Sequence, residues 1–456
     1  MSSTPRAALL RDPNFAWLMS GGVISALGDQ FTLIALPWLV LKLTGDPLAL
    51  GLVIALMGIP RALLILFGGA LVDRYSPKRV LMLTKHANAL LLGLLAALVL
   101  AGRATLPLVT LLALGLSLAS AFSIPAGTSM LPHAVAPQHL QAANGMMMAI
   151  RQVTMLLGPL LAGLLFVLAG DGGHGVQDAR GLGLAFGVDC FSFVLSAWTL
   201  SRVRPLPLAA NEQTQSAAGG VAAPAEPLLR AVGAGVAAVW RDLLLRTAFL
   251  YWGLCACVVG SVMQVALPLL ASNRLHGASA LALLAGAHGA GTLAGMAVSG
   301  VAGKRRIGKL GTTLLLLDGA TGLLLPLLGM ATTLWQSAAV LLAIGMLGGF
   351  ATVAVFTWLQ QRAPRAMLGR VMGIFMFVIM GLTPLGAAVA GWLATLVTLD
   401  ALFAGAGLFL AGAALLAWLL TPMRSLSDAS APGTPGAGMP AGMPAAGMPA
   451  DGTPAP

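Results

Sequence analysis

Residues 48–79 read LALGLVIALMGIPRALLILFGGALVDRYSPKR, an apolar run followed by a short charged loop. A helix needs about 20 largely apolar residues to cross the hydrocarbon core of a bilayer. The part from 48 to 71 exceeds that length and carries a single charge, Arg61. The stretch therefore predicts a transmembrane helix that ends at a charged membrane surface.

The rest of the chain repeats this pattern. Of 456 residues, 58% are apolar and only 9% are charged, against about 25% charged in a soluble domain, which excludes a soluble enzyme. We therefore expect an all-α integral membrane protein with twelve transmembrane helices in two six-helix pseudo-repeats. The predicted spans are 15–41, 48–71, 80–101, 106–126, 144–168, 182–201, 246–271, 278–302, 311–330, 336–358, 371–396 and 401–421.

The basic residues predict the orientation of these spans, because loops rich in Lys and Arg stay on the cytoplasmic side. With the N-terminus inside, most of the 25 Lys and Arg residues fall in cytoplasmic segments, Lys85 among them. Only Lys42, Arg103, Arg180 and Arg274 fall in loops on the outer side of the membrane. We predict a multi-pass protein of the plasma (inner) membrane with both termini cytoplasmic, and the net charge of +11 calls for no nucleic-acid partner.

The longest polar interruption divides the chain into halves. We assign 1–201 to an N-terminal six-helix half, 202–245 to a cytoplasmic central loop that contains an amphipathic helix, and 246–422 to a C-terminal six-helix half. A Gly/Met/Pro-rich tail, 423–456, is predicted to be disordered. The tripeptide Ala-Leu-Pro at 35–37 recurs at 266–268 in the corresponding span, which favours an internal duplication.

The loop between the second and third spans carries the most specific motif. It places small and charged residues in the order Gly69, Asp73, Arg74, Lys78 and Arg79. This order resembles the signature G-x-x-x-D-R/K-x-G-x-R/K-R/K of the major facilitator superfamily, except that Ser76 replaces the second glycine. The phrase LGDQFTLIALPW at 27–38 is similar to the bacterial exporter branch of that family, which includes macrolide-efflux and enterobactin-exporter proteins.

The resemblance implies a gating role for this loop. Asp73 is expected to engage the start of the eleventh span, around 370–373, and so to close the cytoplasmic side. Two interpretations of Lys78 and Arg79 stay open. In the first they have a role in the loop itself, either by pairing with charges of the gate or by binding lipid headgroups. In the second they only set the topology.

The fifth span carries a second motif, formed by Gly145, Thr154, Gly158, Pro159 and Gly163. It resembles the antiporter motif G-x8-G-x3-G-P-x2-G-G, with Thr154 and Ala162 as departures. The resemblance favours export. The alternative is that these small residues only allow neighbouring helices to pack closely.

Charged residues within spans are candidates for proton coupling, because a charge at bilayer depth costs on the order of 2.5 to 3.5 kcal/mol on insertion scales. The candidates are Asp29, Arg61 and Arg151, and Asp318 lies in the ninth span. An Asp29–Arg61 pair could exchange a proton or form a static bridge. The fourth span, 106–126, lacks the arginine that many proton antiporters of the family carry.

Other chemistries find no support in the sequence. There is no Gly-x-x-x-x-Gly-Lys-Ser/Thr loop for a nucleotide and no nucleophile with a base at suitable spacing. Cys190, Cys255 and Cys257 are interpreted as apolar fillers. We therefore expect no enzyme activity, no cofactor and no metal.

The predicted function is proton-driven efflux of an amphipathic small molecule, drug or siderophore-like, by a monomer in the lipid bilayer. The predicted partners are this small-molecule substrate, protons and the bilayer. Proton-coupled uptake of an organic solute, transport of a lysolipid, and a non-transporting sensor on a transporter fold remain as alternatives.

Overall fold

A computed structural model describes residues 9, 12–170, 180–204, 228–275, 277–302, 308–363 and 368–426. The side chains of residues 66–74, at the end of the second span, lie outside this description. So do the first part of the predicted central loop and the tail from residue 427.

Every regular element in these ranges is a helix, and twelve spans are long and apolar enough to cross a membrane, which confirms the predicted fold class. The spans of the first half are α2 (Pro13–Thr44), α3 (Pro47–Arg74), α4 (Pro77–Leu100), α5 (Leu106–Ala134), α6 (Leu140–Ala169) and α7 (Arg180–Arg202). Those of the second half are α10 (Leu243–Ser261) continued by η3 (Val262–Ala266) and α11 (Leu267–Asn273), then α12 (Ala278–Ala302), α13 (Leu310–Met330), α14 (Leu334–Arg362), α15 (Leu368–Leu396) and α16 (Leu399–Leu420). Short 3₁₀ turns η1 (Pro137–His139) and η5 (Pro422–Ser425) precede α6 and follow α16.

Local sequence signals set the helix ends. The Asp12 carboxylate accepts hydrogen bonds from the backbone N–H groups of Asn14 and Phe15, and Pro13 occupies the first turn, where its missing N–H costs nothing. The same helix ends at Gly45, whose φ of 63° is the left-handed conformation that glycine adopts most easily. These caps fix the length of α2, the first span of the bundle.

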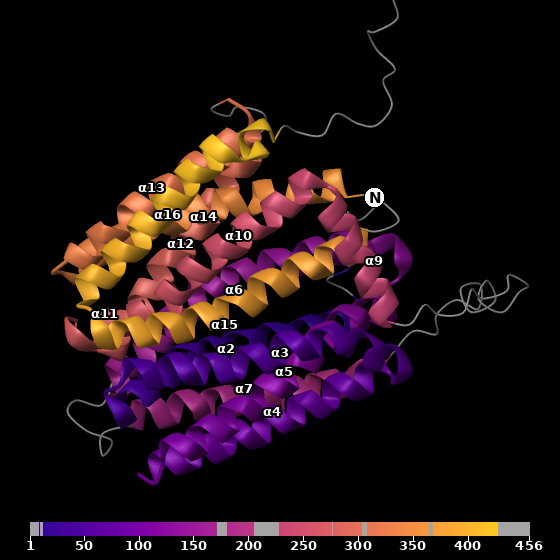
Figure 1. Ribbon diagram of the computed structural model, residues 1–456. Coiled ribbons are helices and arrows are strands. Elements are labelled where there is room, and N and C mark those ends of the chain that lie inside the picture. Colours follow the sequence, from indigo (N-terminus) through magenta and orange to yellow (C-terminus); the bar gives the residue numbers. More distant parts are fainter. Residues whose placement is uncertain are drawn as a thin grey trace, which may run out of the picture.

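The two halves lie side by side (Figure 1). Helices α2–α7, indigo to magenta, form one group, and α10–α16, rose to yellow, form the other. Across the boundary, α3 packs against α15 and α6 against α12. The beginning of α2 and the end of α16 lie at the same end of the bundle, which we call the terminal end. The opposite end is the distal end.

The halves are in close contact in the distal and middle parts of the bundle. A Cβ added to Gly51 of α3 would lie 2.5 Å from the carbonyl oxygen of Ala387 in α15, and one on Gly289 of α12 would lie 2.9 Å from that of Met155 in α6. Towards the terminal end, Gly145 and Gly373 have no described atom within 4 Å of such a Cβ. The boundary is therefore closed in its distal and middle parts.

The seventh span contains a wider turn, the π-helix η3. This turn directly precedes Pro268, which has no N–H to donate to the carbonyl four residues earlier. The N–H of Leu267 instead bonds the carbonyl of Val262, five residues back. The corresponding Pro37 of α2 leaves that helix assigned as α throughout, so the two copies of the Ala-Leu-Pro tripeptide differ in geometry.

A further helix, α9 (Leu228–Arg241), occupies the second part of the predicted central loop. Its Gly235 is buried against α15, where an added Cβ would lie 2.9 Å from Cδ1 of Ile374. The next span begins at Leu243, three residues before the predicted start. Thus only one residue separates the end of α9 from the start of α10.

An ion pair fixes the start of α10. The Asp242 carboxylate caps α10 through the N–H groups of Leu244 and Leu245, and its Oδ2 accepts a 2.8 Å hydrogen bond from Arg362 at the end of α14. Partial burial raises the pKa of Asp242, but these hydrogen bonds and the Arg362 charge outweigh it and hold the pKa below its usual value. The pair therefore joins α10 to α14 at the terminal end.

The pH dependence of this ion pair is testable with Asp242→Asn, since asparagine caps a helix as well as aspartate does. A carboxyl group whose pKa is lowered in the folded state stabilises the fold at pH values above its unfolded-state pKa of about 3.9. This stabilisation is lost as the pH falls through the folded-state pKa. At pH 7 we expect the variant to be less stable by up to about 1 kcal/mol, the range of partly exposed pairs. Thermal unfolding in detergent at pH 7 and at about pH 3 measures the difference in stability between the variant and the wild type. Asp12→Asn serves as the matched control for a helix cap. An equal loss at both pH values would contradict the assignment.

Candidate functional site

The first and sixth spans cross in close contact. Glycine and serine recur on one face of α2 at positions 21, 25 and 28, and they meet serine and threonine side chains of α7. The Ser196 hydroxyl donates a 2.6 Å hydrogen bond to the carbonyl of Gly21. A Cβ on Gly28 would overlap the Ser192 hydroxyl, so only glycine permits this approach.

A buried carboxylate lies in this crossing. Asp189 of α7 is 1% exposed, and its Oδ2 accepts a 2.5 Å hydrogen bond from the Thr32 hydroxyl of α2. Its Oδ1 accepts a second, 3.1 Å bond from Ser192. Two hydroxyl donors thus compensate part of the cost of burying the carboxyl group.

A buried lysine of the third span reaches the same crossing. Lys85 of α4 is 7% exposed, and its ammonium donates to the Ser25 hydroxyl at 3.3 Å and to the Ser196 hydroxyl. The ammonium also lies 5.7 Å from the ring centroid of Phe193. We call the set Ser25, Gly28, Thr32, Lys85, Asp189, Ser192 and Ser196 the polar seam. It joins three helices, α2, α4 and α7.

Asp29 lies beside the polar seam and differs from it in access. Protein atoms surround this residue on most sides, yet its side chain keeps accessible surface. Its carboxyl group is close enough to Lys85 and Asp189 for their charges to interact, although no direct ion pair joins it to Lys85. Asp29 therefore combines access with a neighbouring cation, as a proton-exchanging group requires.

The structure corrects the sequence analysis in two respects. Lys85, predicted in a cytoplasmic segment, is buried among helices because its side chain points to α2 and α7 rather than to the loop. No ion pair joins Asp29 to Arg61 in the described ranges. Arg61 is half-buried in α3, and Arg151 is exposed in α6. Asp189 is missing from the predicted candidates, although a charge within the apolar run 182–201 is itself a signal.

The predicted gating loop is described only in part. Lys78 donates through its ammonium to the carbonyls of Ser201 and Val203 at 3.1 and 2.6 Å, and so caps the end of α7. Arg79 is exposed. Gly69, Asp73 and Arg74 fall where side chains lie outside the description, so their gating role stays a prediction.

The fifth-span motif is placed at the contacts of α6 with both halves. A Cβ on Gly158 would overlap the side chain of Gln30 in α2, and one on Gly163 would lie 3.0 Å from Cβ of Ala282 in α12. Thr154 and Pro159 are buried nearby, whereas Gly145 is exposed. The small residues thus let α6 touch its neighbours in both halves.

The second half has its own buried polar group. The Tyr251 hydroxyl of α10 donates a 2.9 Å hydrogen bond to Oδ2 of Asp318 in α13, and the Cys255 thiol lies 3.9 Å from the same oxygen. Cys255 is therefore more than an apolar filler. In each half, a charged residue of the third span is bonded to the first span: Lys85 in one half and Asp318 in the other.

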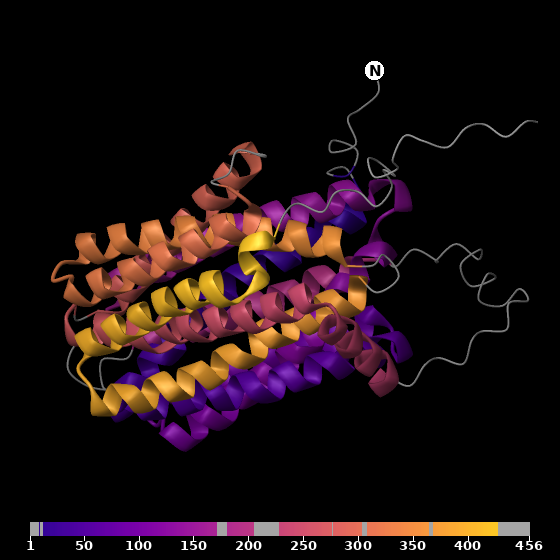
Figure 2. The same cartoon turned by 45° about the horizontal axis from the view of Figure 1, so that its top comes forward.

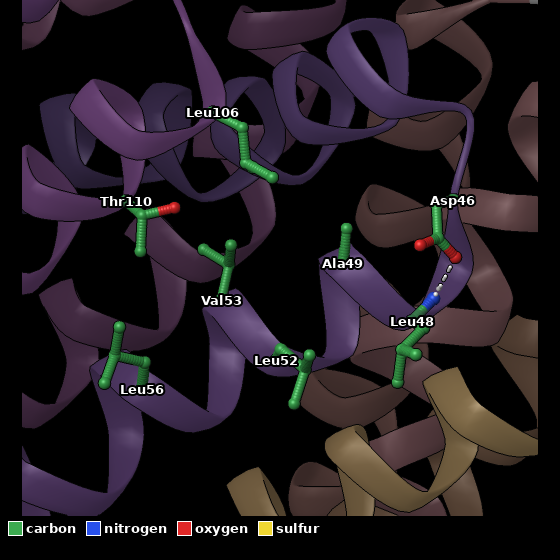
Figure 3. A pocket seen from close by; sticks show the side chains of 8 residues that line it. All are labelled: Asp46, Leu48, Ala49, Leu52, Val53, Leu56, Leu106 and Thr110. Carbon is green, nitrogen blue, oxygen red and sulfur yellow. Dashed lines mark hydrogen bonds between the residues drawn. The ribbon is translucent and has the colours of Figure 1, made fainter.

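A depression of about 250 Å³ lies elsewhere, between the distal ends of α3 and α5 (Figure 3). Its lining is mostly leucine, alanine and valine, with Asp46 and Thr110 at its edges. All lining residues belong to the first half. Because the depression lies away from the boundary between the halves, we do not assign a ligand to it.

The charge balance of the seam is testable by Lys85→Met, which leaves Asp29 without its neighbouring cation. We expect a loss of about 1 to 3 kcal/mol, because buried polar groups lose a partner. Adding Asp29→Asn should restore part of it, because one carboxylate is then neutral. Thermal unfolding of the single and double variants gives the coupling, with the exposed Lys309→Met as control. Additive losses would show that Lys85 and Asp29 do not interact.

Comparisons with known proteins place this geometry in a family. Residues 18–384 match the Major Facilitator Superfamily. The enterobactin exporters EntS of Shigella boydii serotype 18 and Escherichia coli O157:H7 are each 27% identical over 414 residues, which cover 89% of this chain and 91% of theirs.

Solved structures share the fold. They include an inward-facing bacterial homologue of the iron transporter ferroportin, with a TM-score of 0.63, 19% identity and coverage of 88% of this chain and 98% of that one. The nucleoside transporter NupG aligns with a TM-score of 0.67 and 13% identity over 90% of this chain and all of its own. With its twelve candidate spans and a family match over most of its length, the chain belongs to the major facilitator superfamily of membrane transporters.

Proposed function

We propose that this transporter exports an amphipathic small molecule, drug or siderophore-like, in exchange for protons. The observation that carries the proposal is the accessible Asp29 carboxylate beside the buried Lys85. The full-length similarity to proteins named enterobactin exporters supports the direction and the substrate class. No cofactor or metal enters the proposed cycle.

The proposed orientation places the terminal end in the cytoplasm. It rests on the distribution of Lys and Arg, which concentrates basic residues at that end. We infer that the structure is then in a state open towards the cytoplasm, because the two halves are in close contact in the distal and middle parts of the boundary. In this state a substrate could enter from the cytoplasm or the inner leaflet.

In the proposed cycle, Asp29 releases its proton to the cytoplasm while the terminal end is open. The carboxylate that remains is stabilised by the charge of Lys85, whose position Ser25 and Ser196 fix. Substrate then binds between the halves, and the halves rock about the α3–α15 and α6–α12 contacts. Once the distal end opens, a proton from outside returns to Asp29 and the substrate leaves.

Transport into everted vesicles tests the proposal, because these vesicles accumulate what cells export. The panel contains a catecholate siderophore, a macrolide and a cationic dye, each with and without a protonophore. We expect protonophore-sensitive accumulation of a panel member that falls at least about tenfold in Asp29→Asn, since the variant cannot exchange a proton at that position.

The control is Asp46→Asn, an acid near the depression of Figure 3 and remote from the polar seam, at matched protein levels. It should retain transport. No accumulation of any panel member, inward movement in intact cells, or full activity of Asp29→Asn would overturn the proposed function in favour of uptake, lipid transport or sensing.

A further inference from the structure

The seventh span has an uncovered apolar face. Figures 1 and 2 both show α10 at the surface of the bundle, between α15 and α16. One side of α10 packs against α15 and α14 through Phe249 and Trp252. The opposite side leaves Leu243, Leu250 and Leu254 exposed, at a spacing that aligns them along one helix face.

The corresponding face of the first span is covered. Leu250 is 59% exposed, whereas Met19, which stands 231 residues earlier at the matching position of the first repeat, is 8% exposed. Hydrogen bonds from Ser196 to Gly21 and from Thr32 to Asp189 hold α7 against α2. No hydrogen bond joins α10 to α16 in the part of the chain that the structure describes. The pseudo-symmetry is therefore broken at this place, and α10 is left open on its lipid-facing side.

Basic and aromatic side chains stand at the terminal end of this face. In α9, Trp240 is 57% exposed and Val236 is exposed beside it. The Arg246 guanidinium lies 5.7 Å from the ring centroid of Trp240, and Arg241 is exposed next to that tryptophan. Tryptophan favours the headgroup level of a bilayer, and arginine binds phosphate oxygens through paired hydrogen bonds.

We propose that an anionic phospholipid binds this surface as a specific ligand. Its phosphate lies at Arg241 and Arg246, Trp240 packs at the level of the glycerol backbone, and one acyl chain follows the three leucines of α10. The leucines span about 16 Å at 1.5 Å per residue, which is comparable with the length of an extended acyl chain. The proposal does not depend on the substrate or the coupling ion.

The charge at the site favours an anionic over a zwitterionic lipid. Asp242, the acid next to Arg241 in the sequence, is already bonded to Arg362, so it does not neutralise Arg241 and Arg246. A basic residue near a membrane surface contributes about 1 kcal/mol to the binding of an anionic lipid, or roughly fivefold in affinity. Because Gly235 of α9 packs on α15, a bound lipid would also hold α9 against the helix that contacts the first half.

Native mass spectrometry of the full-length, delipidated protein tests the site. Palmitoyl-oleoyl phosphatidylglycerol and the corresponding phosphatidylcholine are titrated separately. We expect one phosphatidylglycerol to bind at least tenfold more tightly than phosphatidylcholine. The double variant Arg241→Gln/Arg246→Gln should remove this preference, whereas Arg103→Gln, an exposed arginine at the distal end, should retain it.

A second pair of variants tests the acyl-chain path without changing any charge. Leu250→Trp should block the path and weaken phosphatidylglycerol binding at least fivefold, whereas Leu90→Trp, at a more exposed leucine of α4, should not. Equal binding of both lipids, or equal effects of the site and control variants, would show an unspecific lipid shell and overturn the proposal. Transport activity does not enter the readout, so this result is independent of the proposed function.

Discussion

The first half depends on one buried cation. An ammonium at bilayer depth is costly unless hydrogen-bond acceptors and opposite charge surround it. Lys85 obtains its acceptors from two different helices, Ser25 of α2 and Ser196 of α7, and its opposite charge from Asp29. Both helices must come close to α4 for this to happen. The glycines at positions 21 and 28 bring α2 close to α7, so that one ammonium reaches hydroxyls of both helices.

The bonds within the halves differ in kind from the contacts between them. Within the first half, hydroxyls, a lysine and a carboxylate join α2, α4 and α7; within the second, Asp318 joins α13 to α10 and the Asp242–Arg362 pair joins α10 to α14. Across the boundary, glycines meet backbone atoms, and Gln152 donates to the weak acceptor Sδ of Met296. Strong polar bonds within each half and small apolar contacts across the boundary suit two rigid bodies that move against each other.

The fold could be predicted from the sequence because a membrane span is recognised by length and apolar content alone, without knowledge of what each face touches. The partners inside the bundle could not, since they depend on helix rotation. Asp29 and Arg61 lie at similar depth, which made them a plausible pair, yet the cation near Asp29 comes from α4. Lys85 was counted with the cytoplasmic residues because it lies close to a basic loop. The recurrence of small residues at 21, 25 and 28 was the available signal for the α2–α7 contact.

In the proposed cycle, the proton on Asp29 determines which end of the transporter is open. Distances between spin labels, measured by double electron–electron resonance, test this role most directly. The labelled variants lack the native Cys190, Cys255 and Cys257. One label pair replaces Arg79 and Arg424 at the terminal end, and the other replaces Arg103 and Trp335 at the distal end, all at exposed positions. Between pH 8 and 5, the account predicts that one distance shortens while the other lengthens, and that Asp29→Asn abolishes the response. Distances that do not change with pH, or that change equally in the variant, would contradict it.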